Sequence, residues 1–304
     1  MKYIYFLLTT LVLSCRGSVQ ILDFQPVKER IYEPELKRET VKAEVSWKLP
    51  DTIPEGSGLL AWNNLLWTHN DSGSAKLYAL SPQTGEIVAN YTLPDVENND
   101  FEDLADDDHF FYVGAIGNNA HQRDTVAIHR ILKSDLLLHK FNSESISVIW
   151  PETFTQKRQQ KINFDCEAMV VVGDSIYLFT KEWEERRRTR IFSVPAKPGI
   201  HVAKYKGSMQ TNVLITGASY HRATRKLILC GHTLLLAPFL IEFDDVQGTD
   251  FFQNPGRKIR LKRMLRQIEG VTTFDGRTYY VINETLRILF KKTPQQLHRV
   301  KLTD

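Results

Sequence analysis

Five short segments of the chain share a pattern that could bring oxygen ligands together. Each has a polar residue with a side-chain oxygen, then a small or acidic residue, then an apolar one, at successive spacings of 45, 65, 49 and 53 residues. The segments are Ser57-Gly58-Leu59, Glu102-Asp103-Leu104, Glu167-Ala168-Met169, Thr216-Gly217-Ala218 and Glu269-Gly270-Val271. Equivalent positions of a structural repeat lie in equivalent places, so the five first residues are predicted to converge.

The converging set would consist of the carboxylates Glu102, Glu167 and Glu269 and the hydroxyls Ser57 and Thr216. Crowded carboxylates raise one another's pKa and need a cation or shared protons. Oxygen ligands without a His/Cys set favour Ca²⁺, or Mg²⁺, over zinc. Two alternatives stay open: hydrogen bonds to the backbone of a neighbouring repeat, and binding of a ligand without metal.

Glu55 is a further candidate metal ligand, because it lies two residues before Ser57 and side chains two apart on a strand share a face. A second strand follows each segment, and its last residues are predicted to return to the same end. These residues are Asn70, Asn118, Asn119, Glu182, His232, Asn283 and Glu284. His69 and Asp71 also lie there and are the candidate bases for any hydrolysis.

Other catalytic chemistry finds little support in the sequence. Ser72 lacks the surroundings of a hydrolase nucleophile, and no phosphate-binding loop or dinucleotide fingerprint occurs. The net charge of +3 is too small to indicate nucleic acid binding.

The elements that must position these residues are short strands. From about residue 43 onwards, β-rich runs alternate with Gly, Asn, Asp and Pro, and three or four strands recur per unit. Four antiparallel strands per unit of 40–50 residues are typical of a propeller blade. The sequence therefore predicts an all-β fold with one propeller of five blades. A sixth blade between 102 and 167 and a β-sandwich are the alternatives. Residues 43–49 could close the ring by pairing with the last blade.

The N-terminus predicts export. Lys2 precedes the apolar run 3–13, which is too short to span a bilayer, and Ser14-Cys15 resembles a lipobox. We therefore expect residues 1–15 to be a lipoprotein signal peptide, Cys15 to carry the lipid, 16–42 to be a polar tether and 43–304 to be the propeller. Plain secretion and a retained membrane anchor are the alternatives for the N-terminus. We also expect a monomer that faces the periplasm and is held to the envelope only by its lipid.

Two cysteines remain after Cys15. Cys166 and Cys230 lie in different repeats, 64 residues apart. An exported protein could pair them, but two buried thiols are the favoured interpretation.

Several phrases together resemble a known group of proteins. They are Glu55-Gly-Ser-Gly-Leu59, Trp67-Thr-His-Asn-Asp-Ser-Gly73, Phe101-Glu-Asp-Leu-Ala105, Tyr112-Val-Gly-Ala-Ile-Gly-Asn-Asn119, Asp165-Cys-Glu-Ala-Met169, Ile215-Thr-Gly-Ala218 and Ile268-Glu-Gly-Val271. Over residues 45–290 the chain resembles uncharacterised propeller lipoproteins of Bacteroidetes-type bacteria. These are similar to phytase-like esterase propellers and, remotely, to calcium-bound gluconolactonase-type propellers.

The remote resemblance implies calcium-dependent hydrolysis, with metal at the positions of Glu102, Glu167 and Glu269. Ser219 departs from the pattern, since an acid would be expected there. Propellers serve many functions, so two functions remain in view. The favoured one is a binding propeller on the envelope that recognises a partner or small ligand. The alternative is a metal-dependent hydrolase of an ester, lactone or phosphoester.

Overall fold

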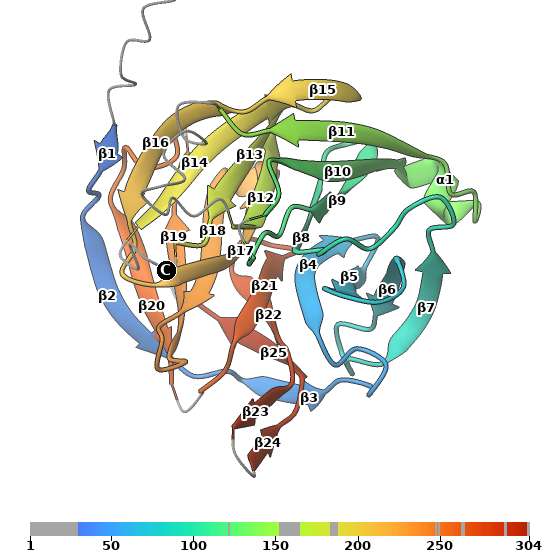
Figure 1. Ribbon diagram of the computed structural model, residues 1–304. Helices are drawn as coiled ribbons and strands as arrows, with labels where there is room; N and C mark the ends of the chain where they lie inside the picture. The colour runs from blue at the N-terminus through green and yellow to red at the C-terminus, as the bar shows by residue number, and fades with distance from the viewer. Residues whose placement is uncertain are drawn as a thin grey trace, which may run out of the picture.

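Five β-sheets stand around one axis, each with its first strand innermost (Figure 1). The computed structural model describes residues 30–302 except 121, 152–164, 183–187, 247, 249, 263–264 and 289–290. The predicted signal peptide and Cys15 lie outside the described residues. The chain is a five-bladed β-propeller, as the repeat predicted. The long interval between 102 and 167 holds the short helix α1 (Lys133–Leu137), and its described residues form no sixth sheet.

The blades follow one another along the chain. Blade 1 comprises β4 (Gly56–Trp62), β5 (Leu65–Asn70), β6 (Lys76–Leu80) and β7 (Ile87–Thr92). Blade 2 comprises β8 (Asp103–Asp106), β9 (Phe110–Ala115), β10 (Thr125–Leu132) and β11 (Ser143–Ile149). Blade 3 comprises β12 (Cys166–Val172), β13 (Ser175–Thr180), β14 (Arg188–Pro195) and β16 (Lys204–Gln210). Blade 4 comprises β17 (Leu214–His221), β18 (Lys226–His232), β19 (Pro238–Phe243) and β20 (Gly256–Leu261), with the 3-10 turn η2 (Arg222–Thr224) between β17 and β18.

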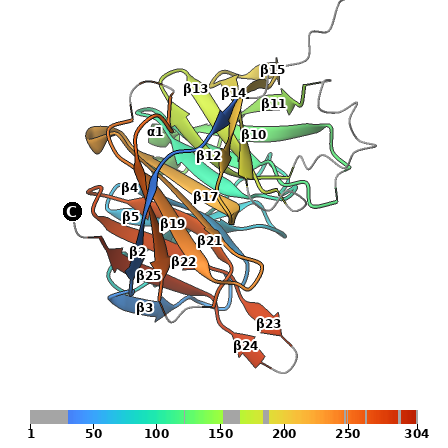
Figure 2. The same cartoon turned by 90° about the vertical axis from the view of Figure 1, so that its left-hand side faces the viewer.

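Blade 5 joins the two ends of the chain. It comprises β21 (Ile268–Thr273), β22 (Thr278–Asn283), β25 (Gln296–Lys301) and, as its outer strand, β3 (Val45–Lys48). β3 pairs antiparallel with β25, which confirms the predicted closure of the ring by the N-terminal strand. Between β22 and β25 the small hairpin of β23 (Leu286–Ile288) and β24 (Lys291–Thr293) projects from the body (Figure 2).

Three further strands lie parallel on the outer edges of blades. β1 (Ile31–Tyr32) pairs with β16, β2 (Leu36–Val41) with β20, and β15 (Gly199–Val202) with β11. An outer edge exposes unpaired backbone groups, and an added strand satisfies them. The prediction of a polar tether is therefore wrong for residues 31–41, which belong to the propeller: their alternating polar side chains are those of an edge strand with one face in water.

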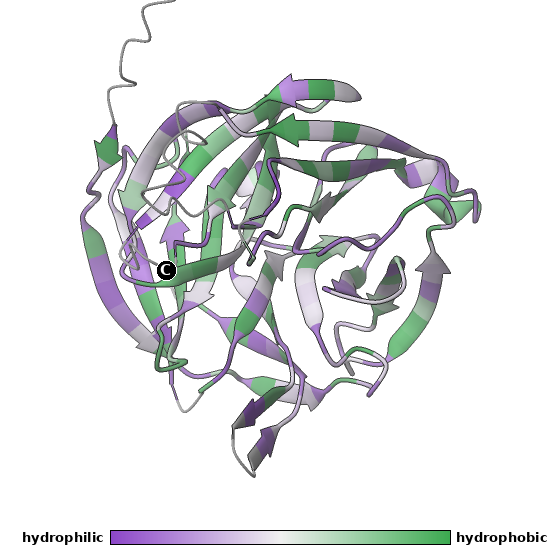
Figure 3. Ribbon diagram, in the orientation of Figure 1, coloured by the Kyte–Doolittle hydropathy of each residue, from purple (hydrophilic) through white to green (hydrophobic). Residues whose placement is uncertain are grey.

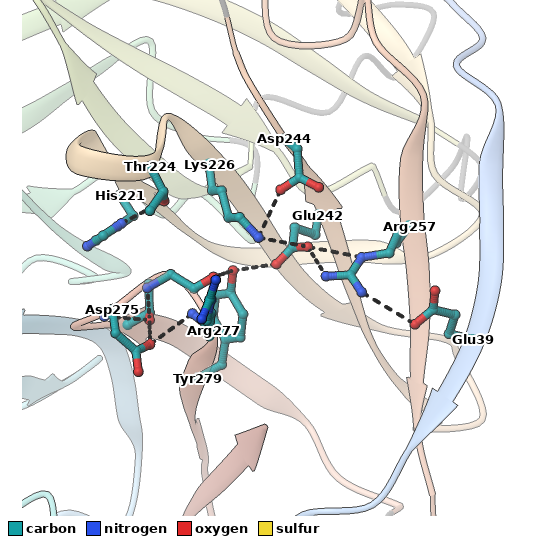
Figure 4. A network of polar contacts seen from close by, with 12 residues as sticks. Glu39, His221, Thr224, Lys226, Glu242, Asp244, Arg257, Asp275, Arg277 and Tyr279 are labelled. Atoms are coloured by element: carbon teal, nitrogen blue, oxygen red, sulfur yellow. Dashed lines mark hydrogen bonds and ion pairs between the residues drawn. The ribbon is translucent and has the colours of Figure 1, made fainter. Parts of the chain in front are cut away.

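A network of charged groups attaches β2 to blade 4 and blade 4 to blade 5 (Figure 4). Buried Glu242 accepts hydrogen bonds from Arg257 and from the Tyr279 hydroxyl, and Lys226 lies 3.7 Å from its carboxylate. Arg257 also lies 3.6 Å from Glu39 of β2.

The apolar core is divided among the blade junctions. Each of five clusters of buried side chains unites neighbouring blades. Between blades 1 and 2, for example, the Trp67 and Phe111 rings meet edge to face at 5.3 Å. Figure 3 shows polar and apolar residues alternating along many strands, as two-faced sheets require. Among the described residues no helix is long and apolar enough to cross a membrane. Cys166 and Cys230 are both free and buried, which confirms the favoured interpretation.

The inner strands carry an irregularity that aims the first residues of the repeat. In blades 3, 4 and 5 the register between the first two strands shifts across Glu167, Thr216 and Glu269. A β-bulge re-aims a side chain and ends regular pairing. In these three blades the repeated motif is therefore a bulge at the opening of the inner strand.

The second residues of the repeat close the centre. A methyl group on Gly270 would lie 2.8 Å from the backbone of Gly58, and one on Gly217 would lie 3.0 Å from Gly270. Small residues here allow neighbouring inner strands to touch. Blade 2 carries Asp103 instead, fully buried, whose Oδ2 accepts the N–H groups of Met169 at 2.8 Å and Ala218 at 3.1 Å. Its carboxylate thus links blade 2 to blades 3 and 4 across the axis.

Candidate metal and ligand site at the acidic mouth

Carboxyl groups gather where the inner strands open, and burial together with neighbouring carboxylates raises the pKa of six of them. We call this group the acidic mouth; its members are Glu55, Asp71, Asp100, Glu102, Asp165, Glu167, Glu269 and Glu284. The protein's net charge is +3, so the negative charge is a local feature of this end of the axis.

Three of these carboxyls form a compact cluster that could hold a metal ion. One oxygen each of Glu102, Asp165 and Glu167 lies within 4.8 Å of the other two, and all three residues are buried. Burial and the neighbouring carboxylates raise the pKa values of Glu102 and Glu167 well above the usual range. The cluster includes two of the four predicted ligands and leaves out Glu269 and Glu55.

Asp165 and Asp100 were missed as members of the site, although the sequence holds a signal for both. Asp165 lies two residues before Glu167, and Asp100 two before Glu102, which is the offset of Glu55 from Ser57. Applied to every repeat, that offset would have found them. Asp100 and Glu102 pack over Gly117, where a methyl group would collide with Glu102 Oε1 and Asp100 Oδ2.

Lys181 is a second feature that the sequence did not reveal. It follows β13, and its ammonium donates to both oxygens of Glu167, at 2.6 Å each. The neighbouring carboxylates Glu167, Glu269 and Asp165 raise the pKa of Lys181 despite its burial. The ammonium supplies one positive charge to the mouth and partly compensates the carboxylates.

The remaining carboxyls lie around Glu269. Burial is the main cause that raises the pKa of Glu269 to about 7, of Asp71 to about 7 and of Glu284 to about 8. Glu55 adds to the rise at Asp71, and Glu269 to that at Glu284. Ser72 donates a 2.6 Å hydrogen bond to Glu55. The pKa values of Asp71, Glu269 and Glu284 therefore lie close to neutral pH.

The two predicted hydroxyls connect blades. Ser57 Oγ donates to the carbonyl of Glu102 at 2.7 Å, and Thr216 Oγ1 donates to that of Ile268 at 2.5 Å. Each bond runs from one inner strand to the next blade. At these two positions the structure shows the hydrogen bonding to neighbouring backbone that the sequence left open as an alternative.

Most of the predicted strand-exit residues hold local structure. Asn118 accepts hydrogen bonds from the backbone of Gln122 and Arg123, and buried Glu182 pairs with Arg190 at 2.5 Å. Asn119 is exposed.

The exit residues of blades 1 and 5 behave similarly. Asn283 accepts a 2.7 Å hydrogen bond from His298 and donates to two carbonyls. Asn70 bonds the backbone of Thr52 and Glu55. These amides fix loops around the mouth.

The two histidines at the mouth, His69 and His232, make the same kind of hydrogen bond. Nδ1 of His69 faces the carbonyl of Asn70 at 3.1 Å, and Nδ1 of His232 faces that of Thr233 at 3.0 Å. A carbonyl accepts only, so each Nδ1 carries the proton and each Nε2 presents a lone pair. Both Nε2 atoms are buried without a hydrogen-bond partner. Burial lowers both pKa values to about 4, so both rings are neutral.

No protein-family model and no curated protein matches this sequence. Solved structures resemble the chain at low identity. A streptogramin B lyase has 10% identity and a TM-score of 0.39 over 79% of this chain and 69% of its own. The WD40 repeats of RRP9 have 7% identity and a TM-score of 0.46 over 86% and 99%. A Bacteroides thetaiotaomicron protein of unknown function has 11% and 0.42 over 82% of this chain, which spans only 58% of that protein. These neighbours include β-propellers, and the likeness concerns the fold alone.

Proposed function

We propose that the acidic mouth is the ligand-binding face of an exported binding propeller, and that Glu102, Asp165 and Glu167 hold a divalent cation there. The observation that carries the proposal is the cluster of three buried carboxylate oxygens within 4.8 Å of one another. Oxygen-only ligands of this kind suit Ca²⁺, or Mg²⁺ with retained waters. The lipid anchor at Cys15 stays a prediction of the sequence.

The donor set fits such an ion despite Lys181. Each carboxylate oxygen has two lone pairs, so Glu167 can accept from the ammonium and still coordinate a cation. Lys181 adds one positive charge, whereas Glu102, Asp165 and Glu167 can each carry a negative one. A bound Ca²⁺ would balance the remainder and fix the loops from which a partner is recognised.

The proposal predicts that calcium stabilises the protein more strongly at high pH than at low pH. In metal-free protein, raised carboxyl pKa values stabilise the folded state below the unfolded values of about 4, and this stability is lost as pH rises through the folded values of about 7 to 8. The melting temperature should therefore fall between pH 5.5 and 8.5. Calcium requires deprotonated ligands, so its stabilisation should be larger at pH 8.5, about 3 kcal/mol at a hundredfold excess over Kd.

Variants separate the cluster from the rest of the mouth. Glu102→Gln should abolish the calcium shift, whereas Glu269→Gln should keep it, because Glu269 is not among the three clustered carboxylates. Exposed Asp95 provides the control Asp95→Asn. If adding Ca²⁺ or Mg²⁺ to chelator-treated protein leaves the melting temperature unchanged at both pH values, the cation site is refuted.

Asp71 favours hydrolysis as a second candidate function. Its Oδ1 is buried without a hydrogen-bond partner, and its pKa of about 7 suits a general base near neutral pH. His69, the other candidate base, is fully buried. A hydrolase should cleave p-nitrophenyl acetate or phosphate with calcium, at a rate that rises through pH 7 and drops at least a hundredfold in Asp71→Asn. Equal rates in the variant would exclude Asp71 as the base.

A further inference from the structure

An apolar groove lies beside the acidic mouth on blade 4. It has a volume of about 350 Å³, and its lining includes Val213, Leu214, His232, Leu234 and Leu235. His232 also borders the mouth, since its Nε2 lies 3.9 Å from Glu269 Oε1. The groove and the mouth therefore meet at this imidazole.

Leu234 and Leu235 belong to an ordered turn. The Thr233 N–H donates to the Ala237 carbonyl at 2.9 Å, and the Leu236 N–H donates to the Thr233 carbonyl at 2.8 Å. The Arg266 N–H donates to the Leu236 carbonyl at 3.0 Å, which ties the turn to the next connection. Leu235 is nevertheless 83% exposed and Leu234 46%. Exposed apolar groups clustered beside a groove mark a binding surface.

His232 offers a hydrogen-bond acceptor where the groove meets the acidic mouth, which we call the inner end of the groove. Its ring is neutral, its Nε2 lone pair is buried without a donor, and the residue is only 3% exposed. A buried acceptor without a donor is destabilising, and a ligand N–H would satisfy it. Glu269 beside it adds negative charge, which the nearby Lys181 ammonium compensates in part. A donor that also carries positive charge is therefore favoured over a neutral one.

We propose that the groove binds an amphiphilic primary amine: the apolar chain lies along Leu234 and Leu235, and the ammonium donates to His232 Nε2 and pairs with Glu269. This inference rests on the proposed function only in taking the mouth as the binding face. It does not use the Glu102–Asp165–Glu167 cluster, so amine binding can be tested independently of cation binding.

The test uses n-hexylammonium as the probe and isothermal titration of chelator-treated protein at pH 7.5. Saturable binding at millimolar concentration or tighter is expected. Leu235→Asp should weaken it about tenfold, since the leucine contributes apolar contact, and its high exposure keeps the fold intact. Leu137 of α1, 53% exposed, gives the matched control Leu137→Asp, which should bind as the unchanged protein does.

A second pair of probes tests the inner end. Hexyltrimethylammonium keeps the chain and charge but has no N–H, and n-hexanol keeps the chain without charge. Both should bind at least fivefold more weakly than hexylammonium. His232→Phe, which keeps a ring but removes the acceptor, should lose the preference for hexylammonium over hexyltrimethylammonium.

Several results would overturn the assignment: no saturable hexylammonium binding, equal affinity in Leu235→Asp, or equal affinity for the trimethylated probe. The calcium-dependent melting shift, measured on Leu235→Asp, should be unchanged. A failure of the cation site would leave hexylammonium binding intact, so the two proposals can be judged apart.

Discussion

Replacing Asp103 by alanine is expected to lower the free energy of unfolding by about 3–5 kcal/mol. Three backbone N–H groups donate to this carboxylate: Leu104 at 2.9 Å, Met169 at 2.8 Å and Ala218 at 3.1 Å. Without the carboxylate these buried donors lose their acceptors, each at about 1–3 kcal/mol, with partial relaxation reducing the sum. Reversible urea unfolding measures the effect.

A graded series makes the Asp103 prediction specific. Asp103→Asn keeps one carbonyl oxygen but turns an NH₂ group towards an N–H donor, so an intermediate loss of about 1–3 kcal/mol is expected. Asp108 follows the same strand and its side chain is 84% exposed, so Asp108→Asn should change stability by less than about 0.5 kcal/mol. A loss below 1 kcal/mol for the alanine variant would show that the centre is not held by this carboxylate.

The second large effect is expected at Lys181. Lys181→Met leaves Glu167 buried without its ammonium, and breaking one side of a buried pair costs about 3–5 kcal/mol. The carboxyl can escape this cost by binding a proton, because its pKa is already raised by burial. A carboxyl whose pKa is raised by folding binds a proton more tightly in the folded state. It therefore adds to the free energy of unfolding at low pH, and this contribution is lost as pH rises. The loss should therefore be smaller at pH 5.5 than at pH 8.

A double-mutant cycle checks this prediction. Glu167→Gln combined with Lys181→Met removes both charges, so the double variant should be more stable at pH 8 than Lys181→Met alone, with a coupling of about 2 kcal/mol or more. Lys181→Arg keeps the charge and serves as the conservative control. Additive losses at both pH values would contradict a direct pairing of the two side chains in the mouth.

The sequence by itself determined the repeat, and with it the propeller, because the motif at the strand openings, the hairpin turns and the alternating strands are local features that recur along the chain. It also placed Glu102, Glu167 and Glu269 at one end of the axis, since equivalent positions of a closed ring must face the same way. The closing strand β3 was predictable from its alternating pattern and from the missing outer strand of the last unit.

Only the tertiary structure decided which of these residues contact one another. Whether Glu102 joins Asp165 or Glu269 depends on distances between blades, and so does the position of the Lys181 ammonium. The assignment of β1 and β2 to blade edges depends on backbone groups left unpaired far along the chain. Asp103 is the clearest case: the sequence shows an acid among small residues, but its function comes from N–H groups 66 and 115 residues away. Local periodicity fixes strands, whereas burial and charge are properties of the assembled ring.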